Sequence, residues 1–262
     1  MDLGLNGKRV LVTGGSGGIG QGICRAFAAE GALVAVHWHR NEDAAKRLAA
    51  DLPGAVAVGG DLGTEEGAEA TVAAATSAFG GLDVLVHCAG VWPEEPLPLW
   101  QLSLERIEAT LRVDLTAAFM AAGAFLRQLE GQRQDHGNLV FIGSTAGIFG
   151  EADHADYAAA KAAVIFGLVR SLKNEIVRIA PRGRVNAVSP GWVRTPMTRA
   201  ALEDPTLDLE RRITRTMPLR KLATAADVAN QVVLLASDTA SGHVSGQIVT
   251  VAGGMEGRIL HE

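Results

Sequence analysis

Short apolar runs rich in β-branched residues alternate along the chain with longer, alanine-rich stretches. The short runs are apolar at successive positions, which is typical of strands that are covered on both faces in a parallel sheet. This pattern predicts seven strands, at Arg9–Thr13, Leu33–Val36, Ala55–Val58, Val84–His87, Leu139–Gly143, Val185–Val188 and Ile248–Val251. The stretches between them predict helices at Ile19–Glu30, Glu42–Asp51, Glu65–Phe79, Leu104–Leu129, Ala155–Ile179 and Ala225–Leu235.

The repeated strand–helix order predicts an α/β fold of the Rossmann type. We expect a doubly wound, seven-stranded parallel sheet with helices on both faces and right-handed crossovers. No linker, repeat or low-complexity tract divides the sequence, so we expect one domain over residues 1–262. The one long irregular stretch runs from Trp192 to Thr216, and a loop of that length usually forms a lid or a binding segment. We therefore predict a substrate lid near residues 192–216.

Composition and charge exclude several classes of partner. The 262 residues are 48% hydrophobic and carry a net charge of −5, which argues against nucleic acid or an anionic membrane as a partner. No apolar run predicts a membrane span, and no signal peptide opens the chain. The two cysteines, Cys24 and Cys88, lie in apolar contexts typical of buried free thiols. We expect a cytoplasmic protein without disulfides.

The first predicted strand leads into the glycine-rich loop "TGGSGGIG", which opens the first predicted helix. Glycines allow a sharp turn and let the backbone approach a pyrophosphate, which then meets the N–H groups and positive dipole end of the helix. Because this loop joins a strand to a helix, it favours a dinucleotide site over a simple tight turn. The predicted contacts here are Gly14, Ser16, Gly18, Ile19 and Gly20.

A second constellation lies in "GSTAGIFGEADHADYAAAK". Tyr157, the only tyrosine of the chain, and Lys161 are four residues apart, so they share one face of a helix. An ammonium group one turn away favours the phenolate and lowers the pKa of the phenol. Ser144 ends a predicted strand, where its hydroxyl can donate to a substrate oxygen that gains negative charge. Each residue alone would be an ordinary surface or turn residue, and the combination points to acid–base chemistry.

With these pieces, the sequence resembles the short-chain dehydrogenase/reductase family from Lys8 to Gly254. The matching motifs are "TGGSGGIG", "GDL", "HCAG", Ser144, "YAAAK" and "VNAVSPGWVRTPM". The resemblance is to the single-domain branch with the 3-oxoacyl-carrier-protein reductases and many alcohol and sugar dehydrogenases. It implies NAD(P)-dependent hydride transfer between nicotinamide and a carbonyl or secondary alcohol. It also implies a homotetramer or homodimer assembled through the two long helices.

The resemblance assigns roles to individual residues. Tyr157 would be the general acid/base, Lys161 would lower its pKa and bond the nicotinamide ribose, and Ser144 would polarise the carbonyl. Asp61 would touch the adenine edge of the cofactor. The remaining implied cofactor contacts are Leu62, Ala89, Gly90, Pro190, Gly191, Val193 and Thr195.

Four positions depart from the family pattern. Its "NNAG" is "HCAG" here, and we expect a structural rather than catalytic role for His87. A family asparagine that helps a proton relay through its backbone carbonyl aligns with Asp114, so the fourth member of the catalytic set stays open. Ala252 replaces an aspartate in a segment that the family places at subunit contacts. Trp92 either lines the substrate pocket or packs as an ordinary aromatic residue.

The segment "VHWHRNE" follows the second predicted strand, at the place where the family binds the adenosine ribose. The register of this strand puts Trp38 where NAD-specific relatives have an acidic residue, and Arg40 follows. An arginine can pair with a ribose 2′-phosphate, and pteridine reductases of this family have a similar run. We therefore expect NADP(H) as the preferred cofactor, with NAD(H) as the alternative. The His-x-His pattern is interpreted as part of this selector and not as a metal site.

Several questions stay open at this stage. The arginines of the lid, Arg194, Arg199, Arg211 and Arg212, contact either an anionic substrate or solvated carboxylates, and the latter is more common. The polar stretch "EADHAD" borders the pocket without predicting a metal, because chemistry through serine, tyrosine and lysine needs none.

A catalytically weak NADP-binding regulator is the alternative function. A serine hydrolase is disfavoured, since "GSTAG" lacks the Gly-x-Ser-x-Gly elbow. The substrate itself is not specified.

Overall fold

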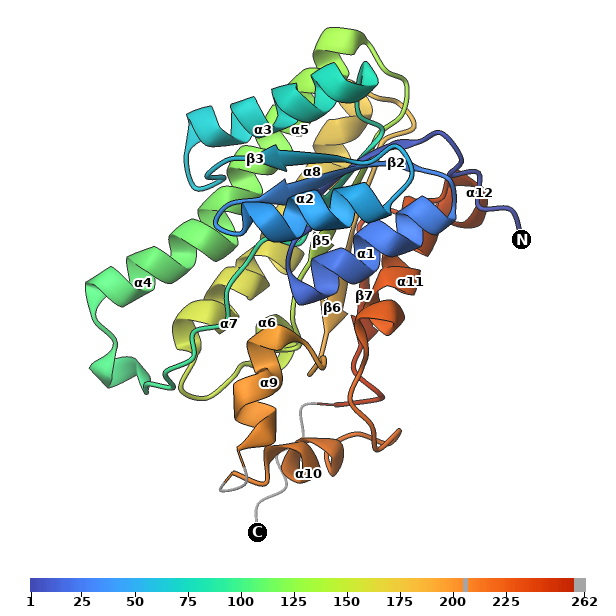
Figure 1. Cartoon of the computed structure of the whole chain (residues 1–262). Coiled ribbons are helices and arrows are strands. Elements are labelled where there is room, and N and C mark those ends of the chain that lie inside the picture. Colours follow the sequence, from blue (N-terminus) through green and yellow to red (C-terminus); the bar gives the residue numbers. More distant parts are fainter. Residues whose placement is uncertain (205–206, 257–262) are drawn as a thin grey trace.

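The computed structural model describes residues 1–204 and 207–256, and its seven strands form a single parallel sheet (Figure 1). The strand order is β3-β2-β1-β4-β5-β6-β7, which confirms the predicted Rossmann-type fold. The order reverses between β1 and β4, and ligands of such sheets bind outside the carboxyl ends of the strands at this point. The strands are β1 (Arg9–Thr13), β2 (Leu33–Trp38), β3 (Val56–Gly59), β4 (Val84–His87), β5 (Asn138–Ile142), β6 (Arg184–Pro190) and β7 (Ile248–Val251).

The helices fill the connections between strands and extend the carboxyl edge of the sheet. They are α1 (Gly18–Ala29), α2 (Glu42–Asp51), α3 (Glu65–Phe79), α4 (Leu104–Leu111), α5 (Ala117–Gln132), α6 (Ala146–Phe149), α7 (Ala155–Ala162), α8 (Val169–Glu175), α9 (Pro196–Glu203), α10 (Leu209–Thr214), α11 (Ala225–Ala236) and α12 (Asp238–Ser241). Short 3₁₀ turns lie at Leu99–Gln101 and Ile176–Arg178. The two long predicted helices each contain a π-helical turn, at Arg112–Thr116 and Ala163–Leu168.

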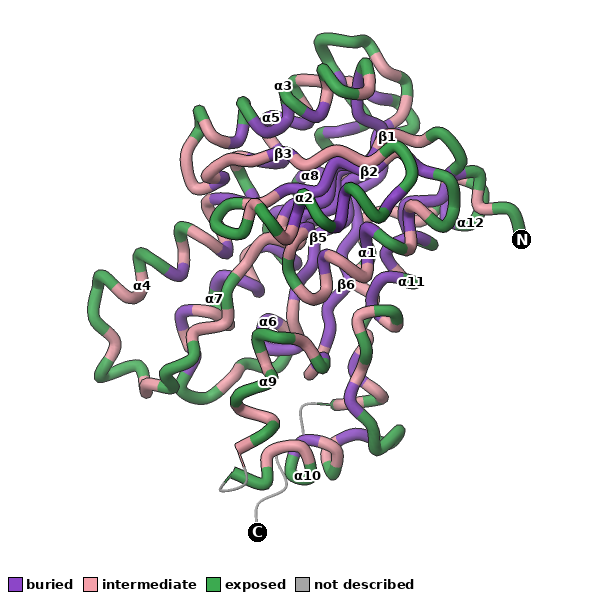
Figure 2. Tube along the Cα trace, in the orientation of Figure 1, coloured by how far each residue is buried: buried purple, intermediate pink, exposed green. Residues whose placement is uncertain are grey.

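Two hydrophobic cores cover the two faces of the sheet. Leu11 of β1 packs with α3, α5 and α8 on one face, whereas its neighbours Val10 and Val12 pack with α1, α2 and α11 on the other. Successive strand residues are therefore buried on opposite faces, which explains why the strands are apolar without alternation. Figure 2 shows the result as a buried central sheet beneath more exposed helices.

The predicted elements need corrections at their ends and in the lid. β2 continues to Trp38, β6 runs from Arg184 to Pro190, and β3 and β5 are shifted by one residue. The prediction of an irregular Trp192–Thr216 stretch is wrong, because α9 and α10 lie within it. α9 begins at a capping box of Thr195 and Thr198, with Pro196 in its first turn, so local signals start a helix where charge suggested a loop. Residues 205–206 of the lid and 257–262 of the predicted domain lie outside the described residues.

The continuous helix Leu104–Gln132 is long and apolar enough, by length and composition, to cross a membrane. The sequence pattern predicted this helix but no membrane span. Its side chains Ala118, Ala121 and Phe125 are fully buried in the core against the sheet. We therefore interpret the apolar character of this helix as that of a core helix.

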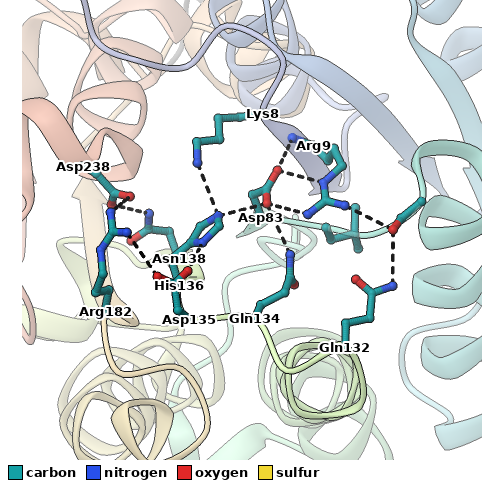
Figure 3. Close-up of polar contacts among 12 residues, drawn as sticks. Lys8, Arg9, Asp83, Gln132, Gln134, Asp135, His136, Asn138, Arg182 and Asp238 are labelled. Carbon is teal, nitrogen blue, oxygen red and sulfur yellow. Dashed lines mark hydrogen bonds and ion pairs between the residues drawn. The ribbon is translucent and has the colours of Figure 1, made fainter.

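A network of charged side chains ties the amino ends of the strands together (Figure 3). Arg9, at the start of β1, holds the carboxylate of Asp83 through two guanidinium nitrogens at 2.7 and 2.9 Å. His136 adds a contact to Asp83 at 3.1 Å, and Lys8 lies 3.3 Å from the same ring nitrogen. Burial raises the pKa of Asp83, but the hydrogen bonds and charge of Arg9 outweigh this effect and leave the pKa lowered. The network thus fixes the relative positions of β1, β4 and the segment before β5, at the edge opposite the glycine loop.

We expect Asp83→Asn to lower the free energy of unfolding by about 2 kcal/mol, because a charged, largely buried group loses its partner. The stabilisation in the native protein is complete above the unfolded pKa of aspartate, about 3.9, and is lost as the pH falls through the lower folded pKa. Urea unfolding measured between pH 3 and pH 7 tests both points. Asp51→Asn, at an exposed 3.4 Å pair with Arg25, is the matched control and should cost less than about 0.5 kcal/mol. Equal effects of the two substitutions would contradict the prediction.

Candidate active site

The predicted site residues converge on one cavity of about 400 Å³ at the carboxyl edge of the sheet. The lining includes the glycine loop and the side chains of Trp92, Glu151 and Trp192. Asp114 is the only predicted site residue that does not line it. Those that do are Gly14, Ser16, Gly18, Ile19, Gly20, Arg40, Asp61, Leu62, Ala89, Gly90, Ser144, Tyr157, Lys161, Pro190, Gly191, Val193 and Thr195.

The glycine loop is shaped for close approach of a ligand. Gly14 has a φ of 61°, and a Cβ added there would lie 2.8 Å from the Cα of Ala89. A Cβ on Gly20 would overlap the carbonyl oxygen of Gly14. Gly17 caps α1 without a side-chain hydrogen bond, so no side chain of this cap accepts from the N–H groups of the first turn. This cradle fits the pyrophosphate of a dinucleotide, whose negative charge the helix N-terminus favours.

His37 holds this loop through a hydrogen bond to the backbone. The backbone N–H of Gly14 donates to Nδ1 at 3.0 Å, so Nδ1 carries no proton, and Nε2 is left to donate to the carbonyl of Gly60 at 3.1 Å. Burial lowers the pKa of His37 to about 4, which keeps the ring neutral. His37 is thus a fixed connection between the glycine loop and the end of β3. This role was not predicted from the sequence, although a histidine inside an apolar strand is a buried polar group that needs hydrogen-bond partners.

The end of β2 presents His39 and Arg40 to the cavity. Trp38, which the strand register placed at the acidic position of NAD-specific relatives, does not line the cavity and packs against the hydrophobic core beside Gly59. Arg40 is exposed and makes no ion pair with any described residue. Asp61 accepts from the N–H of Gly63 and from Arg112 at 3.1 Å, and these contacts lower its pKa. This end of the cavity therefore offers a free cation and a carboxylate.

Tyr157, Lys161 and Ser144 lie together beyond the end of β5. The ammonium nitrogen of Lys161 lies 5.6 Å from the centre of the Tyr157 ring. Burial raises the pKa of Tyr157, while the charge of Lys161 and the hydroxyl of Ser144 lower it. The lysine thus acts in the predicted direction, while the net pKa of the phenol lies above its ordinary value of 10. Burial is the larger effect because water no longer solvates the phenolate.

Asp114 acts through its side chain. Its Oδ1 lies 3.0 Å from the ammonium nitrogen of Lys161 and accepts from the N–H of Val91 at 3.2 Å. Burial lowers the pKa of Lys161, but Asp114 reverses this effect and raises that pKa to about 12. The pKa of Asp114 is raised by its own burial, against the influence of Lys161. A Cβ on Gly90 would lie 2.6 Å from Oδ1, so the ion pair explains why a glycine stands there.

Both residues of this ion pair adjoin π-helical turns. Asp114 lies inside the turn Arg112–Thr116, and Lys161 lies two residues before the turn Ala163–Leu168. Such turns shift the direction of side chains and are frequent at functional sites.

His87 is a structural residue here, as expected. Its Nδ1 lies 3.1 Å from the hydroxyl of Thr13, and that hydroxyl accepts from the N–H groups of Cys88 and Ala89. Burial lowers the pKa of His87 to about 3, and the side chain does not line the cavity. The expected burial of both thiols holds for Cys24 only, because Cys88 lines the cavity. Thr13, not singled out from the sequence, therefore holds the "HCAG" turn beside the glycine loop.

The substrate end of the cavity is aromatic and acidic. Trp92 stacks on His154 with ring centres 4.7 Å apart and meets Trp192 edge-on at 5.6 Å. Its indole N–H donates to Glu151 at 3.0 Å. Asp156, at the end of the polar segment 151–156, is buried and pairs with Arg106 at 2.9 Å. Trp92 thus lines the cavity and packs in an aromatic cluster at the same time.

The lid contributes backbone and threonine contacts to the cavity. A Cβ on Gly18 would lie 2.7 Å from Cβ of Thr195, so the start of α9 packs directly against the glycine loop. Arg194 pairs with Glu210 at 2.6 Å and Arg211 with Asp208 at 3.6 Å, in solvated ion pairs as expected. Ala252 is buried beside Gly191. Within residues 1–204 and 207–256, no group of three or more His, Cys, Asp or Glu side chains is placed to hold a metal ion.

Comparisons with known proteins agree with this architecture. A family model described as enoyl-(acyl carrier protein) reductase matches residues 14–256. The chain is 35% identical to the 3-oxoacyl-[acyl-carrier-protein] reductases MabA of Mycobacterium bovis and FabG of Escherichia coli, over 95% of this chain and 92% and 97% of theirs. It is also 35% identical to 2,5-dichloro-2,5-cyclohexadiene-1,4-diol dehydrogenase of Sphingobium indicum, over 95% of this chain and 97% of that protein.

Solved structures give the same result. The structure titled gox2181 superposes with a TM-score of 0.88 at 29% identity, covering 95% of this chain and 96% of that one. A short-chain dehydrogenase/reductase of Brucella melitensis, titled glucose/ribitol dehydrogenase, gives 0.85 at 30% identity over 95% of this chain and 97% of that one. The chain therefore belongs to the short-chain dehydrogenase/reductase family and is an oxidoreductase that acts on CH–OH and carbonyl groups.

Proposed function

We propose that the chain is an NADP(H)-preferring dehydrogenase/reductase that interconverts a carbonyl and a secondary alcohol, with Tyr157 as general acid/base. The observation that carries the proposal is the placement of Tyr157, Lys161 and Ser144 in the same cavity as the glycine loop. The names of its relatives support two substrate groups, 3-oxoacyl thioesters and cyclic diols. Family membership supports a nicotinamide cofactor, and its identity as NADP(H) is argued from Arg40.

The residues present fit such a cofactor. The glycine loop would hold the pyrophosphate, Asp61 and Leu62 the adenine end, and Lys161 the nicotinamide ribose. The remaining contacts at the nicotinamide end would come from Ala89, Gly90, Pro190, Gly191, Val193 and Thr195. When bound, nicotinamide supplies a hydride to the substrate carbon or accepts one from it.

The protein's part in reduction is to hold and protonate the substrate oxygen. Ser144 would donate a hydrogen bond to the carbonyl oxygen, where negative charge develops as hydride reaches the carbon. Tyr157 would then transfer its proton to that oxygen, and the ammonium of Lys161 would stabilise the phenolate that remains. In oxidation the phenolate takes the hydroxyl proton back. Asp114 would act as a positioning residue, because it holds Lys161 without lining the cavity.

Two helix faces support the proposed assembly as a homotetramer or homodimer. Phe119 on α5 and Phe166, between α7 and α8, are large apolar side chains that are 50% and 38% exposed. Burial of these rings against a second copy would remove apolar surface from water.

We expect Tyr157→Phe to reduce kcat by at least about a hundredfold for any carbonyl that the wild type reduces, since general acid–base catalysis contributes that much. The measurement is NADPH oxidation with a panel of ketones and 3-oxoacyl thioesters. Cofactor affinity of the variant, followed by fluorescence titration, serves as the control for folding. Equal rates in both proteins would exclude Tyr157 as the acid. Cofactor binding without turnover of any compound would favour the catalytically weak regulator.

Asp114→Asn should lower the pKa of Tyr157, because it removes the anion that offsets the charge of Lys161. Tyr157 is the only tyrosine, so its phenolate absorbance can be titrated directly in the folded protein without a substrate. The alkaline requirement for alcohol oxidation should shift to lower pH by the same amount, since oxidation needs the phenolate. Asp61→Asn, which also removes a cavity-edge carboxylate, is the control. An unchanged or raised tyrosine pKa in Asp114→Asn would show that the ion pair does not tune the acid.

Arg40→Ala should raise the Kd for NADPH about tenfold while leaving the Kd for NADH nearly unchanged, because only NADPH has a 2′-phosphate for this guanidinium. Arg25→Ala, on the outer face of α1, is the matched control and should leave both values unchanged. Calorimetric titration with each cofactor makes the comparison. A tighter complex with NADH than with NADPH in the wild type, unaffected by Arg40→Ala, would refute the NADP(H) preference.

A further inference from the structure

We propose that Glu151, Trp92 and Trp192 form a subsite that binds a hydroxyl group next to the reacting carbon of a small cyclic substrate. The three residues line the same cavity as Tyr157. The subsite would select hydroxylated ring ketones and diols over unsubstituted or anionic ones. This inference rests on the proposed function, because it specifies which substrates reach Tyr157.

Glu151 is held in one orientation as a hydrogen-bond acceptor. Its Oε1 accepts from the indole N–H of Trp92 at 3.0 Å, and no described residue bonds to its Oε2. The side chain is 26% exposed, and Glu151 lines the cavity. A partly buried carboxylate with a free oxygen costs free energy unless it finds a donor. A substrate hydroxyl is a donor of suitable size, since it can bond to that oxygen without requiring a charge.

The two indoles give the subsite flat and rigid walls. His154 supports Trp92 from one side, with ring planes 20° apart, and is itself fixed by Nε2 at 3.0 Å from the carbonyl of Pro93. Trp192 meets the same indole at 69°. Such walls match the C–H face of a ring better than a flexible chain, and they lose little side-chain freedom on binding.

The charge of the subsite disfavours anionic substrates. Glu151 and Tyr157 line the same cavity, and the charge of Glu151 acts to raise the pKa of the phenol, so this carboxylate would also repel an anion bound beside Tyr157. The arginines of the described lid do not line the cavity, and Arg194 is already paired with Glu210, so they do not offset this negative charge. Repulsion between the Glu151 carboxylate and an anionic substrate is stronger in a partly desolvated cavity than in water.

Three ketones with the same ring test the proposal: cyclohexanone, 2-hydroxycyclohexanone and 4-oxocyclohexanecarboxylate. With NADPH, the wild type should show a kcat/KM about tenfold higher for the hydroxyketone than for cyclohexanone, the effect of one hydrogen bond to a charged group. The carboxylate should be the poorest of the three.

Glu151→Gln should bring the ratio of hydroxyketone to cyclohexanone close to one and raise kcat/KM for the anionic ketone about tenfold. Glu94→Gln, at an exposed carboxylate that does not line the cavity, is the matched control and should keep the wild-type ratios. Trp92→Phe keeps an aromatic wall but removes the N–H that holds Glu151. It should also lower the ratio, which tests the proposal independently if Glu151→Gln folds poorly.

A wild type without preference for the hydroxyketone, or a preference that both variants keep, would overturn the subsite while leaving the proposed function intact. In that case cyclohexanone reduction would still depend on Tyr157. A wild type that reduces 3-oxoacyl thioesters but none of the three ketones would likewise overturn the subsite alone. A Tyr157→Phe variant that reduces cyclohexanone as fast as the wild type would overturn the proposed function, and the subsite with it.

Discussion

The buried ion pair of Lys161 and Asp114 is the contact on which the arrangement of the site depends. It joins the helix that carries Tyr157 to the helix that follows β4, and it does so beneath Gly90, where no side chain fits. An ammonium group buried alone would lose its proton or disrupt its surroundings, so the carboxylate keeps Lys161 charged. The same carboxylate weakens the effect of Lys161 on the phenol, because the pair is nearly neutral when seen from a distance. The contact therefore keeps Lys161 charged, but it also reduces the amount by which that charge lowers the pKa of Tyr157.

The amino edge of the sheet carries a stabilising polar network, and the carboxyl edge carries the candidate active site. At the amino edge, Arg9, Asp83 and His136 form a network whose members satisfy one another. At the carboxyl edge, Arg40 and the free oxygen of Glu151 have no hydrogen-bond or ion-pair partner among the described residues, and the first turn of α1 has no capping side chain. Groups left without partners at one edge are tolerated because the other edge and the two cores hold the strands in register. Ligand binding can then satisfy them.

Much of the fold could be predicted from the sequence because each strand is buried on both faces, which makes its apolar run continuous. The lid could not, since the capping box of Thr195 and Thr198 outweighs the high charge of that stretch. Within the site, Tyr157, Lys161 and Ser144 were predicted from spacing and resemblance. Their electrostatics were not, because the net effect on the phenol depends on its burial and on Asp114, which is 43 positions before Tyr157 in the sequence. Contacts between distant segments, such as Trp92 with Trp192, have no signal in local patterns.

Histidine illustrates how position decides the role of a residue in this site. His37, His87 and His154 are all buried, and each has a ring nitrogen bonded to the protein. His37 and His87 are kept neutral by burial, which lowers their pKa values to about 4 and about 3. They support the glycine loop and the turn beside it, while His154 supports the indole of Trp92. The three histidines thus support the elements around the site, and we assign proton transfer to the phenol of Tyr157.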